Sequence, residues 1–169
     1  DTIAVSLNGD TETIRIIGIN TPETVDPRKT VECFGKEASQ KAKEYFTNSG
    51  NTVWLESDLT QGERDKYQRL LRYVFINNDA ADYGKTMIAT GYAFEYTYNT
   101  PYKYQTDFKN AQKTAQEKKA GLWSSNTCNG NTTQPASATT PISTPTSTKV
   151  DTTSSCEIKG NISSSKEKI

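Results

Sequence analysis

Basic and oxygen-bearing side chains stand close together in the segment "IRIIGINTPET", residues 14–24, where an apolar run ends. Arg15 precedes Asn20 by five residues, and Glu23 follows Pro22, which stiffens the backbone beside it. A guanidinium group suits a phosphate, and amide and carboxylate oxygens suit a hard metal cation. Asn, Thr and Pro are also common turn residues, so this segment alone leaves a plain turn open.

A second charged segment, "ERDKYQR" at residues 63–69, provides further groups for such a site. It carries Arg69, and Asp1 stands directly before the first predicted strand. Two arginines can grip one phosphate through paired N–H donors, and Asp1 and backbone carbonyls could supply oxygen ligands for a cation. A carboxylate such as Glu23 would orient or deprotonate an attacking water. If the strands form one barrel, these groups meet at one mouth and predict metal-assisted hydrolysis of a phosphodiester.

The overall composition narrows the possible chemistry. The 169 residues include 20 basic residues, 20 acidic residues and no histidine. Ser–His and Cys–His catalysis and histidine-bound zinc are therefore excluded. Zero net charge gives no sign of a nucleic-acid partner, so any basic footprint must be local. No stretch approaches the roughly 20 apolar residues of a membrane span.

The three cysteines, at positions 33, 128 and 156, are too few and too scattered for a structural zinc centre. A disulfide between Cys33 and Cys128 is compatible with an oxidising compartment and would leave Cys156 over. Free buried thiols are an equally open alternative.

The elements that must position these groups indicate an α+β domain. Asn8 and Gly9 between two alternating segments predict a two-residue type I′ hairpin that joins antiparallel strands at 2–7 and 10–19. Apolar periodicity and glycine stops predict the remaining elements, which are strands at 52–57 and 68–77 and helices at 36–50, 82–91 and 106–121. The aromatic residues expected in the core are Tyr73, Phe75, Phe108 and Trp123. The arginines expected at the surface are Arg64 and Arg72.

A sharp change in composition near Cys128 divides the chain into three parts. Residues 1–128 form the predicted domain, and its abrupt first strand suggests that another strand precedes it in the full protein. Residues 129–155 are almost all Thr, Ser, Pro, Ala and Asn, which predicts a disordered linker typical of exported or envelope-attached proteins. Residues 156–169 are interpreted as the start of a truncated C-terminal module.

Six collinear motifs make the chain similar to the staphylococcal nuclease (thermonuclease) family of calcium-dependent phosphodiesterases. They span about residues 1–124 and are "DT" at 1–2, "IRIIGINTPET" at 14–24, "FGKEAS" at 34–39, "DKYQRLLRYVF" at 65–75, "GYAFEYTY" at 91–98 and "KKAGLW" at 118–123. The resemblance implies a five-stranded OB-fold-type β-barrel with three α-helices. It also implies cleavage of DNA and RNA with little sequence preference, at the P–O5′ bond, leaving 3′-phosphates. We expect a secreted or cell-envelope-associated bacterial monomer.

The resemblance also implies a role for each site residue. The matches to the Ca²⁺ ligands are Asp1, Asn20 and the carbonyl of Thr21. Glu23 matches the general base, which also contacts the metal through water. The matches to the phosphate-gripping arginines are Arg15 and Arg69. The matches to the nucleotide pocket, where tyrosines offer stacking faces, are Lys66, Tyr67, Tyr96 and Tyr98.

Two features depart from the family pattern. Family members commonly carry Asp where this chain has Asn20, and the loss of one charge should weaken calcium binding without abolishing activity. A free α-ammonium group at Asp1 would oppose a cation beside it. The alternative function is therefore a catalytically impaired OB-fold module that binds nucleic acid. A third possibility, an envelope adhesion protein, rests only on the Thr/Ser/Pro-rich tail.

Overall fold

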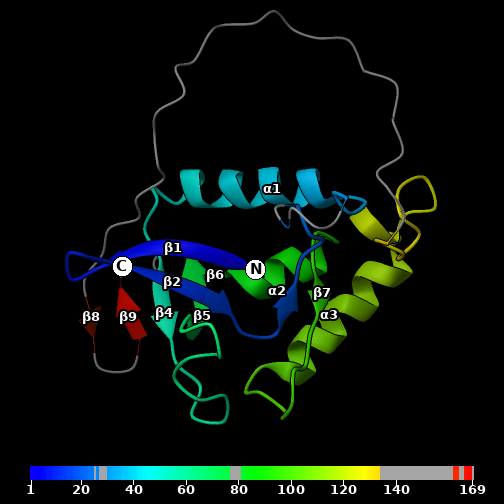
Figure 1. Cartoon of the computed structure of the whole chain (residues 1–169). Helices are drawn as coiled ribbons and strands as arrows, with labels where there is room; N and C mark the ends of the chain where they lie inside the picture. The colour runs from blue at the N-terminus through cyan, green and yellow to red at the C-terminus, as the bar shows by residue number, and fades with distance from the viewer. Residues whose placement is uncertain (25, 27–29, 77–80, 134–161, 164–165, 169) are drawn as a thin grey trace, which may run out of the picture.

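The computed structural model describes residues 1–24, 26, 30–76, 81–133, 162–163 and 166–168. A mixed β-sheet and three α-helices make up this part of the chain (Figure 1). The α+β class and the three helices are as predicted, but the described strands are more numerous than the expected five, and several are only two or three residues long. Most of the predicted linker lies outside the described residues, as does Cys156.

The first two strands form the predicted hairpin. β1 (Thr2–Leu7) pairs antiparallel with β2 (Asp10–Ile16). The two turn residues, Asn8 and Gly9, both have positive φ angles, 54° and 95°, as a type I′ turn requires. The register that follows from this turn places Thr2 opposite Arg15. The start of the chain therefore lies beside the first candidate phosphate-binding arginine.

A parallel pair at the centre of the sheet brings the second arginine to the same end. β5 (Leu70–Ile76) runs parallel to β2, and Leu71 lies opposite Arg15. Arg69 directly precedes β5, so it reaches the region of Arg15 across the strand boundary. The strands completing the sheet are β4 (Trp54–Glu56) and β6 (Ala81–Asp82), both antiparallel to β5, then β9 (Lys166–Lys168) antiparallel to β4 and β8 (Ile162–Ser163) antiparallel to β9.

The predicted strand at 10–19 is interrupted before its end. β2 stops at Ile16, and Gly18 adopts a φ angle of 82°. A side chain at Gly18 would also approach the ring of Tyr102 to 2.7 Å, so glycine is required here. The chain continues as β3 (Ile19–Asn20), which pairs with β7 (Phe94–Glu95) in a separate two-stranded sheet. This pairing places Asn20 opposite Phe94, and the carbonyl of Gly18 accepts from the N–H of Tyr96, which follows β7.

The helices are α1 (Gly35–Asn48), α2 (Tyr83–Ala89) and α3 (Gln105–Glu117), and a short 3-10 turn, η1 (Gly121–Trp123), follows α3. Their predicted apolar faces are buried, as Ala38 of α1 and Phe108 of α3 show. In Figure 1, α1 crosses the top of the molecule and α3 runs along the right side. Tyr73 and Phe75 of β5 lie in the same core, as predicted, and Trp123 is partly buried.

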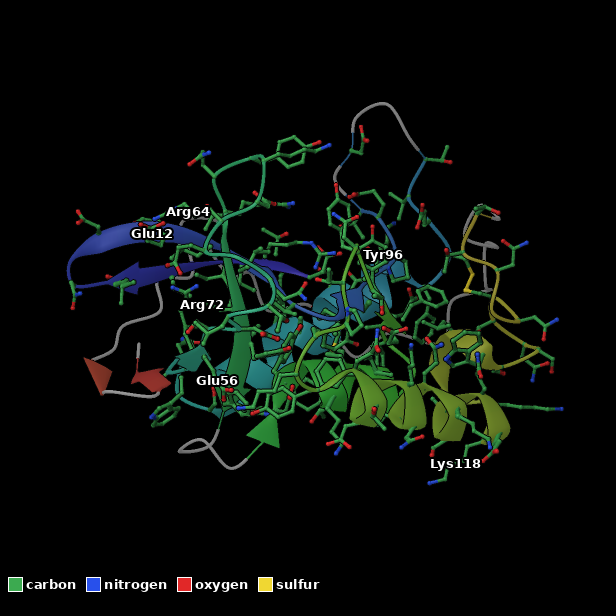
Figure 2. All side chains as sticks on the ribbon, turned by 90° about the horizontal axis from the view of Figure 1, so that it is seen from below. Glu12, Glu56, Arg64, Arg72, Tyr96 and Lys118 are labelled. Carbon is green, nitrogen blue, oxygen red and sulfur yellow. A yellow bond between two sulfur atoms is a disulfide. The ribbon has the colours of Figure 1, made fainter. Side chains whose placement is uncertain are left out.

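The prediction that Arg72 is a surface charge is wrong. Its side chain is only 7% exposed, and its Nη2 pairs with Oε1 of Glu63 at 2.5 Å. In the view of Figure 2, Arg72 appears between the labelled Glu12 and Arg64 on one side and Glu56 on the other. The surface prediction failed because the ion pair with Glu63 satisfies the buried guanidinium group of Arg72 inside an otherwise apolar strand. Arg64 lies nearer the surface, where it forms a bidentate pair with Glu12.

Cys33 and Cys128 form a disulfide, so this alternative for the two thiols is confirmed. The bond joins the segment before α1 to the loop after η1, and it is packed with Leu122 in a small apolar cluster beside Phe34, Phe94 and Trp123. Within the described ranges, no helix has both the length and the apolar character needed to cross a membrane.

Candidate active site

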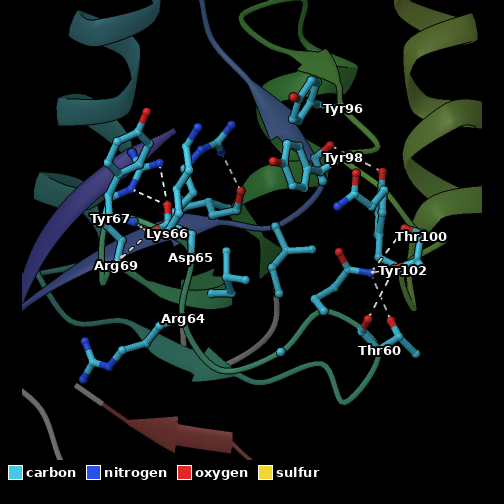
Figure 3. A pocket seen from close by; sticks show the side chains of 18 of the residues that line it. Thr60, Arg64, Asp65, Lys66, Tyr67, Arg69, Tyr96, Tyr98, Thr100 and Tyr102 are labelled. Carbon is cyan, nitrogen blue, oxygen red and sulfur yellow. Dashed lines mark hydrogen bonds and ion pairs between the residues drawn. The ribbon is translucent and has the colours of Figure 1, made fainter.

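A cavity of about 770 Å³ lies between the loop before β5 and the segment after β7 (Figure 3). In the close view, Lys66 and Tyr67 face Tyr96 and Tyr98 across the opening. The predicted site residues that line it are Arg15, Asn20, Lys66, Tyr67, Arg69, Tyr96 and Tyr98. The cavity thus unites the predicted phosphate-binding and nucleotide-binding groups, while Asp1, Thr21 and Glu23 are not among its lining residues.

Backbone carbonyls hold Arg15 in place at the end of β2. Its Nη1 donates to the carbonyl oxygens of Ile16 at 2.7 Å and Ile19 at 2.8 Å, and its Nη2 lies 3.8 Å from Oδ2 of Asp1. Burial, followed by the positive charge of Arg69, lowers the pKa of Arg15 to about 10. Arg15 therefore remains charged at neutral pH, and it lies near enough to Arg69 for the two charges to interact.

Asp65 orients Arg69. The Nε and Nη2 atoms of Arg69 contact Oδ2 of Asp65 at 2.7 and 2.6 Å. Its Nη1 donates to Oγ1 of Thr2 at 3.2 Å, and that hydroxyl donates to Oδ1 of Asp1 at 3.2 Å. A polar chain therefore connects Asp1 to Arg69. Sequence reasoning missed Asp65, although its spacing four residues before Arg69 is a signal that could have identified it.

Three tyrosine rings lie exposed beside these cations. The side chains of Tyr67 and Tyr98 are each 67% exposed, and that of Tyr96 is 42% exposed. The Cζ atoms of Arg69 and Arg15 lie 5.2 Å from the Tyr67 ring centre and 5.9 Å from the Tyr96 ring centre, respectively. Exposed rings next to guanidinium groups can stack on bases while the cations bind phosphates. This arrangement suits a nucleic-acid strand.

The predicted metal ligands lie together beside the arginines. Asp1 Oδ2 accepts from the backbone N–H of Thr21 at 3.1 Å, and Asn20 is exposed next to it in β3. The donor set is made of oxygens only, namely one carboxylate, one amide and one carbonyl, and this chemistry fits a hard cation such as Ca²⁺. Within the described part of the chain, no cluster of three or more His, Cys, Asp or Glu residues could hold a metal. With a single carboxylate, the predicted ligand set of Asp1, Asn20 and the Thr21 carbonyl carries little negative charge.

The α-amino group of Asp1 belongs to the same cluster and donates to Oγ1 of Thr21 at 3.2 Å. Burial, followed by the charge of Arg15, lowers the pKa of this amine to about 5, and the charge of Glu23 acts in the opposite direction. The amine is therefore less protonated near neutral pH than an exposed amino group would be. The same effects show that Glu23, Arg15 and Arg69 all lie within electrostatic reach of Asp1.

Glu23 stands on a loop held by hydrogen bonds. Its Oε1 accepts from the backbone N–H groups of Thr24 at 2.8 Å and Asp26 at 3.2 Å. Its own N–H donates to Oε2 of Glu32 at 3.0 Å, and its carbonyl accepts from the N–H of Glu32 at 2.9 Å. The carboxylate orientation is thus coupled to the backbone of Thr24 and Asp26.

Comparison with known proteins identifies relatives of this chain. A family model described as "Staphylococcal nuclease homologue" matches residues 13–125. A thermonuclease of Staphylococcus hyicus is 40% identical over 124 residues, which cover 73% of this chain and 70% of that protein. The SPbeta prophage-derived endonuclease YokF of Bacillus subtilis is 38% identical over 128 residues, covering 75% of this chain and 41% of that protein. Endonuclease YncB of the same species is 36% identical over 126 residues, covering 73% and 57%, respectively.

Proposed function

Because the chain belongs to the staphylococcal nuclease family, we propose that it is a calcium-dependent nuclease that hydrolyses phosphodiester bonds of DNA and RNA with little sequence preference. The names of its relatives, thermonuclease and endonuclease, support this reaction. The observation that carries the proposal is the approach of Arg15 and Arg69 to Asp1 at one end of the sheet, next to exposed tyrosine rings.

The two arginines bind the phosphate that is cleaved. Each guanidinium group has planar N–H donors that match phosphate oxygens. Arg15 is largely buried, with 14% of its side chain exposed, so its electrostatic effect is little reduced by water. Donors fixed before the reaction stabilise the charge that develops in the transition state.

Glu23 positions the attacking water and takes its proton. The water oxygen bonds to phosphorus, the P–O5′ bond breaks, and the 5′-oxygen leaves and takes up a proton. The products are a 3′-phosphate and a 5′-hydroxyl. Tyr67, Tyr96 and Tyr98 hold the flanking bases by stacking, and Lys66 adds a positive charge at the same wall of the cavity.

The residues that would hold Ca²⁺ are Asp1, Asn20 and the Thr21 carbonyl, with Glu23 beside them. When bound, this cation supplies charge neutralisation at the phosphate. Since Asn20 is uncharged, we propose that calcium binds more weakly here than at a site with a second carboxylate, toward roughly 10⁻³ M.

The test is an assay of product ends. The chain is incubated with DNA or RNA in calcium, and the products are analysed for 3′-phosphate and 5′-hydroxyl groups. Both nucleic acids should yield these ends, and a calcium chelator should stop the reaction. Products with 5′-phosphates would contradict cleavage at P–O5′.

One observation favours the alternative of a binding module with impaired catalysis. Of the three predicted metal ligands, Asp1 alone is charged, and its carboxylate already accepts hydrogen bonds from Thr2 and Thr21. Binding of DNA without any hydrolysis, at every calcium concentration, would support this alternative. Such binding should weaken steeply as salt rises.

We propose that the protein acts as a monomer outside the cytoplasm or at the cell envelope. The disulfide between Cys33 and Cys128 supports an oxidising compartment. Division into a domain at 1–128, a linker at 129–155 and a further C-terminal module remains part of this proposal. Within the last segment, β8 pairs with β9, and β9 pairs with β4 of the predicted domain.

A further inference from the structure

The backbone of Glu23 is fastened at two points by one residue. Glu32 accepts the Glu23 N–H with its side chain at 3.0 Å and donates its own N–H to the Glu23 carbonyl at 2.9 Å. This reciprocal pair removes freedom from the peptide units on both sides of Glu23. Because Glu23 Oε1 accepts from Thr24 and Asp26 of the same loop, a shift of this backbone also shifts the carboxylate.

Glu32 is itself held by its neighbours along the chain. Its carbonyl accepts from the N–H of Gly35 at 3.0 Å, at the start of α1. The next residue, Cys33, is bonded to Cys128, and its N–H donates to the carbonyl of Thr132 at 3.2 Å. The segment that carries Glu32 is thus attached both to a helix and, covalently, to a loop nearly a hundred residues away.

Gly35 packs α1 directly against the Glu23 loop. A Cβ atom at this position would lie 2.7 Å from Cγ2 of Thr24 and 3.2 Å from the carbonyl oxygen of Glu23. The loop therefore lies against the helix start without space for a side chain. Hydrogen bonds, close packing and a covalent bond all act on the same short stretch of backbone.

We propose that Glu32, fixed by the Cys33–Cys128 disulfide, is a positioning residue that holds the Glu23 carboxylate in place for the reaction. This inference rests on the proposed function, in which Glu23 handles the attacking water. Catalytic groups must be held to within about 0.5 Å, and a misplacement of about 1 Å can cost on the order of 100-fold in rate. A carboxylate on a loop meets this demand only when the loop is fixed.

The first test compares Glu32→Ala with Glu32→Gln. The alanine variant loses the side-chain acceptor for the Glu23 N–H, so kcat should fall by about 10- to 100-fold with KM nearly unchanged. The glutamine variant keeps an acceptor oxygen and should recover most of the turnover. Glu37→Ala, which removes an exposed acidic residue from the first turn of α1, is the matched control for loss of charge. Equal kcat in Glu32→Ala and the wild type would overturn the inference.

A second test measures how firmly Glu32 holds the backbone of Glu23, without using activity. Amide hydrogen exchange at Glu23 should be at least about 10-fold faster in Glu32→Ala than in the wild type, and close to the wild type in Glu32→Gln. Unchanged protection in Glu32→Ala would overturn the inference even if the enzyme were inactive for another reason.

A third test concerns the disulfide. In the double variant Cys33→Ser/Cys128→Ser, kcat per folded molecule should fall with little change in KM. Adding Glu32→Ala to this background should cost less than it costs in the wild type, because both changes release the same loop. If the loss merely followed the unfolded fraction, measured by circular dichroism, the disulfide would have no positioning role.

Glu23→Gln, measured in parallel, separates the two proposals. If Glu23→Gln keeps full activity, the assigned role of Glu23 is wrong. The amide hydrogen exchange measurement still decides whether Glu32 holds the backbone of Glu23 in place. If Glu23→Gln is inactive while Glu32→Ala keeps wild-type kcat, the proposed function stands and the positioning role fails.

Discussion

The two sides of the candidate site are built in different ways. On the sheet side, Arg15 belongs to β2 and Arg69 precedes β5, and a parallel ladder joins these strands. On the loop side, Glu23 belongs to no helix or strand, and its N–H donates to Glu32, which precedes the disulfide-bonded Cys33. The predicted phosphate-binding arginines thus lie in or directly before a strand, whereas the predicted base lies on a loop.

This difference predicts that the two sides respond differently to amino-acid substitutions. Arg15 is a strand residue and Arg69 directly precedes a strand, so the arginine side should fail mainly when a guanidinium group, or Asp65 that contacts Arg69, is changed. The loop side can lose its geometry through substitutions that never touch the substrate. The following experiments probe one side at a time.

The largest effect is expected on the sheet side, from Arg69→Lys. Lysine keeps the charge but not the planar donors, so kcat/KM should fall by about 100- to 1,000-fold. Arg64→Lys is the matched control, because Arg64 belongs to the same loop but pairs with Glu12. If neither variant lost activity, a general positive field, and no specific guanidinium group, would hold the phosphate; equal losses would show that the effect is not specific to Arg69.

On the loop side, removal of the disulfide should affect stability. It closes a long loop, with a sequence separation of 95, so Cys33→Ser/Cys128→Ser should lower the free energy of unfolding by about 2–4 kcal/mol. Urea unfolding without reductant measures this change. The wild type in excess dithiol should lose the same amount, and a smaller loss in dithiol would indicate a defect caused by the serines.

Where the two sides meet, Asn20→Asp should sharpen metal binding. The added carboxylate increases the negative charge around the cation, so half-maximal activity should need about 10-fold less calcium. Asn99→Asp places the same charge elsewhere on the cavity wall and serves as the control. If both variants shift the calcium requirement equally, the effect is electrostatic and Asn20 is not a ligand.

The smallest effect is expected on the stability of the fold at low pH, and it concerns Asp58. Burial raises the pKa of Asp58, but hydrogen bonds from Lys103, Tyr73 and Thr60 more than offset this, so the pKa lies below its ordinary value. Asp58 therefore stabilises the fold above its unfolded-state pKa of about 3.9, and this contribution is lost as the pH falls through the lower folded-state value.

Urea unfolding between pH 7 and pH 2.5 measures this dependence. One carboxyl group contributes at most about 1.4 kcal/mol per pH unit to the slope, and Asp58→Asn should remove that part. An unchanged slope in Asp58→Asn would assign the acid sensitivity to other carboxylates.

Sequence reasoning identified the sheet side better than the loop side, and the reason is physical. The Asn8–Gly9 turn sets the register of β1 and β2 locally, and that register places Arg15 beside the chain start. The end of the strand at Ile16 was not predicted, because Gly18 is required by close packing against the ring of Tyr102, which is distant in the sequence.

The contacts that hold the loop side come from residues whose closeness the sequence does not show. Glu32 contacts Glu23 nine residues away by side chain and backbone together, and nothing in the spacing distinguishes it from a surface acid. The disulfide could be proposed only as one of two alternatives, because it depends on the packing of Leu122 of η1 with Cys33, which lies before α1. Asp65, in contrast, has a local signal in its spacing before Arg69.

A calcium titration of DNA hydrolysis by the full chain and by Glu23→Gln tests the proposed function most directly. Wild-type hydrolysis should rise from zero in chelator to saturation at roughly millimolar calcium. Glu23→Gln should bind DNA with similar affinity but hydrolyse it about 100- to 10,000-fold more slowly. Wild-type hydrolysis that is independent of calcium, or full activity in Glu23→Gln, would contradict it.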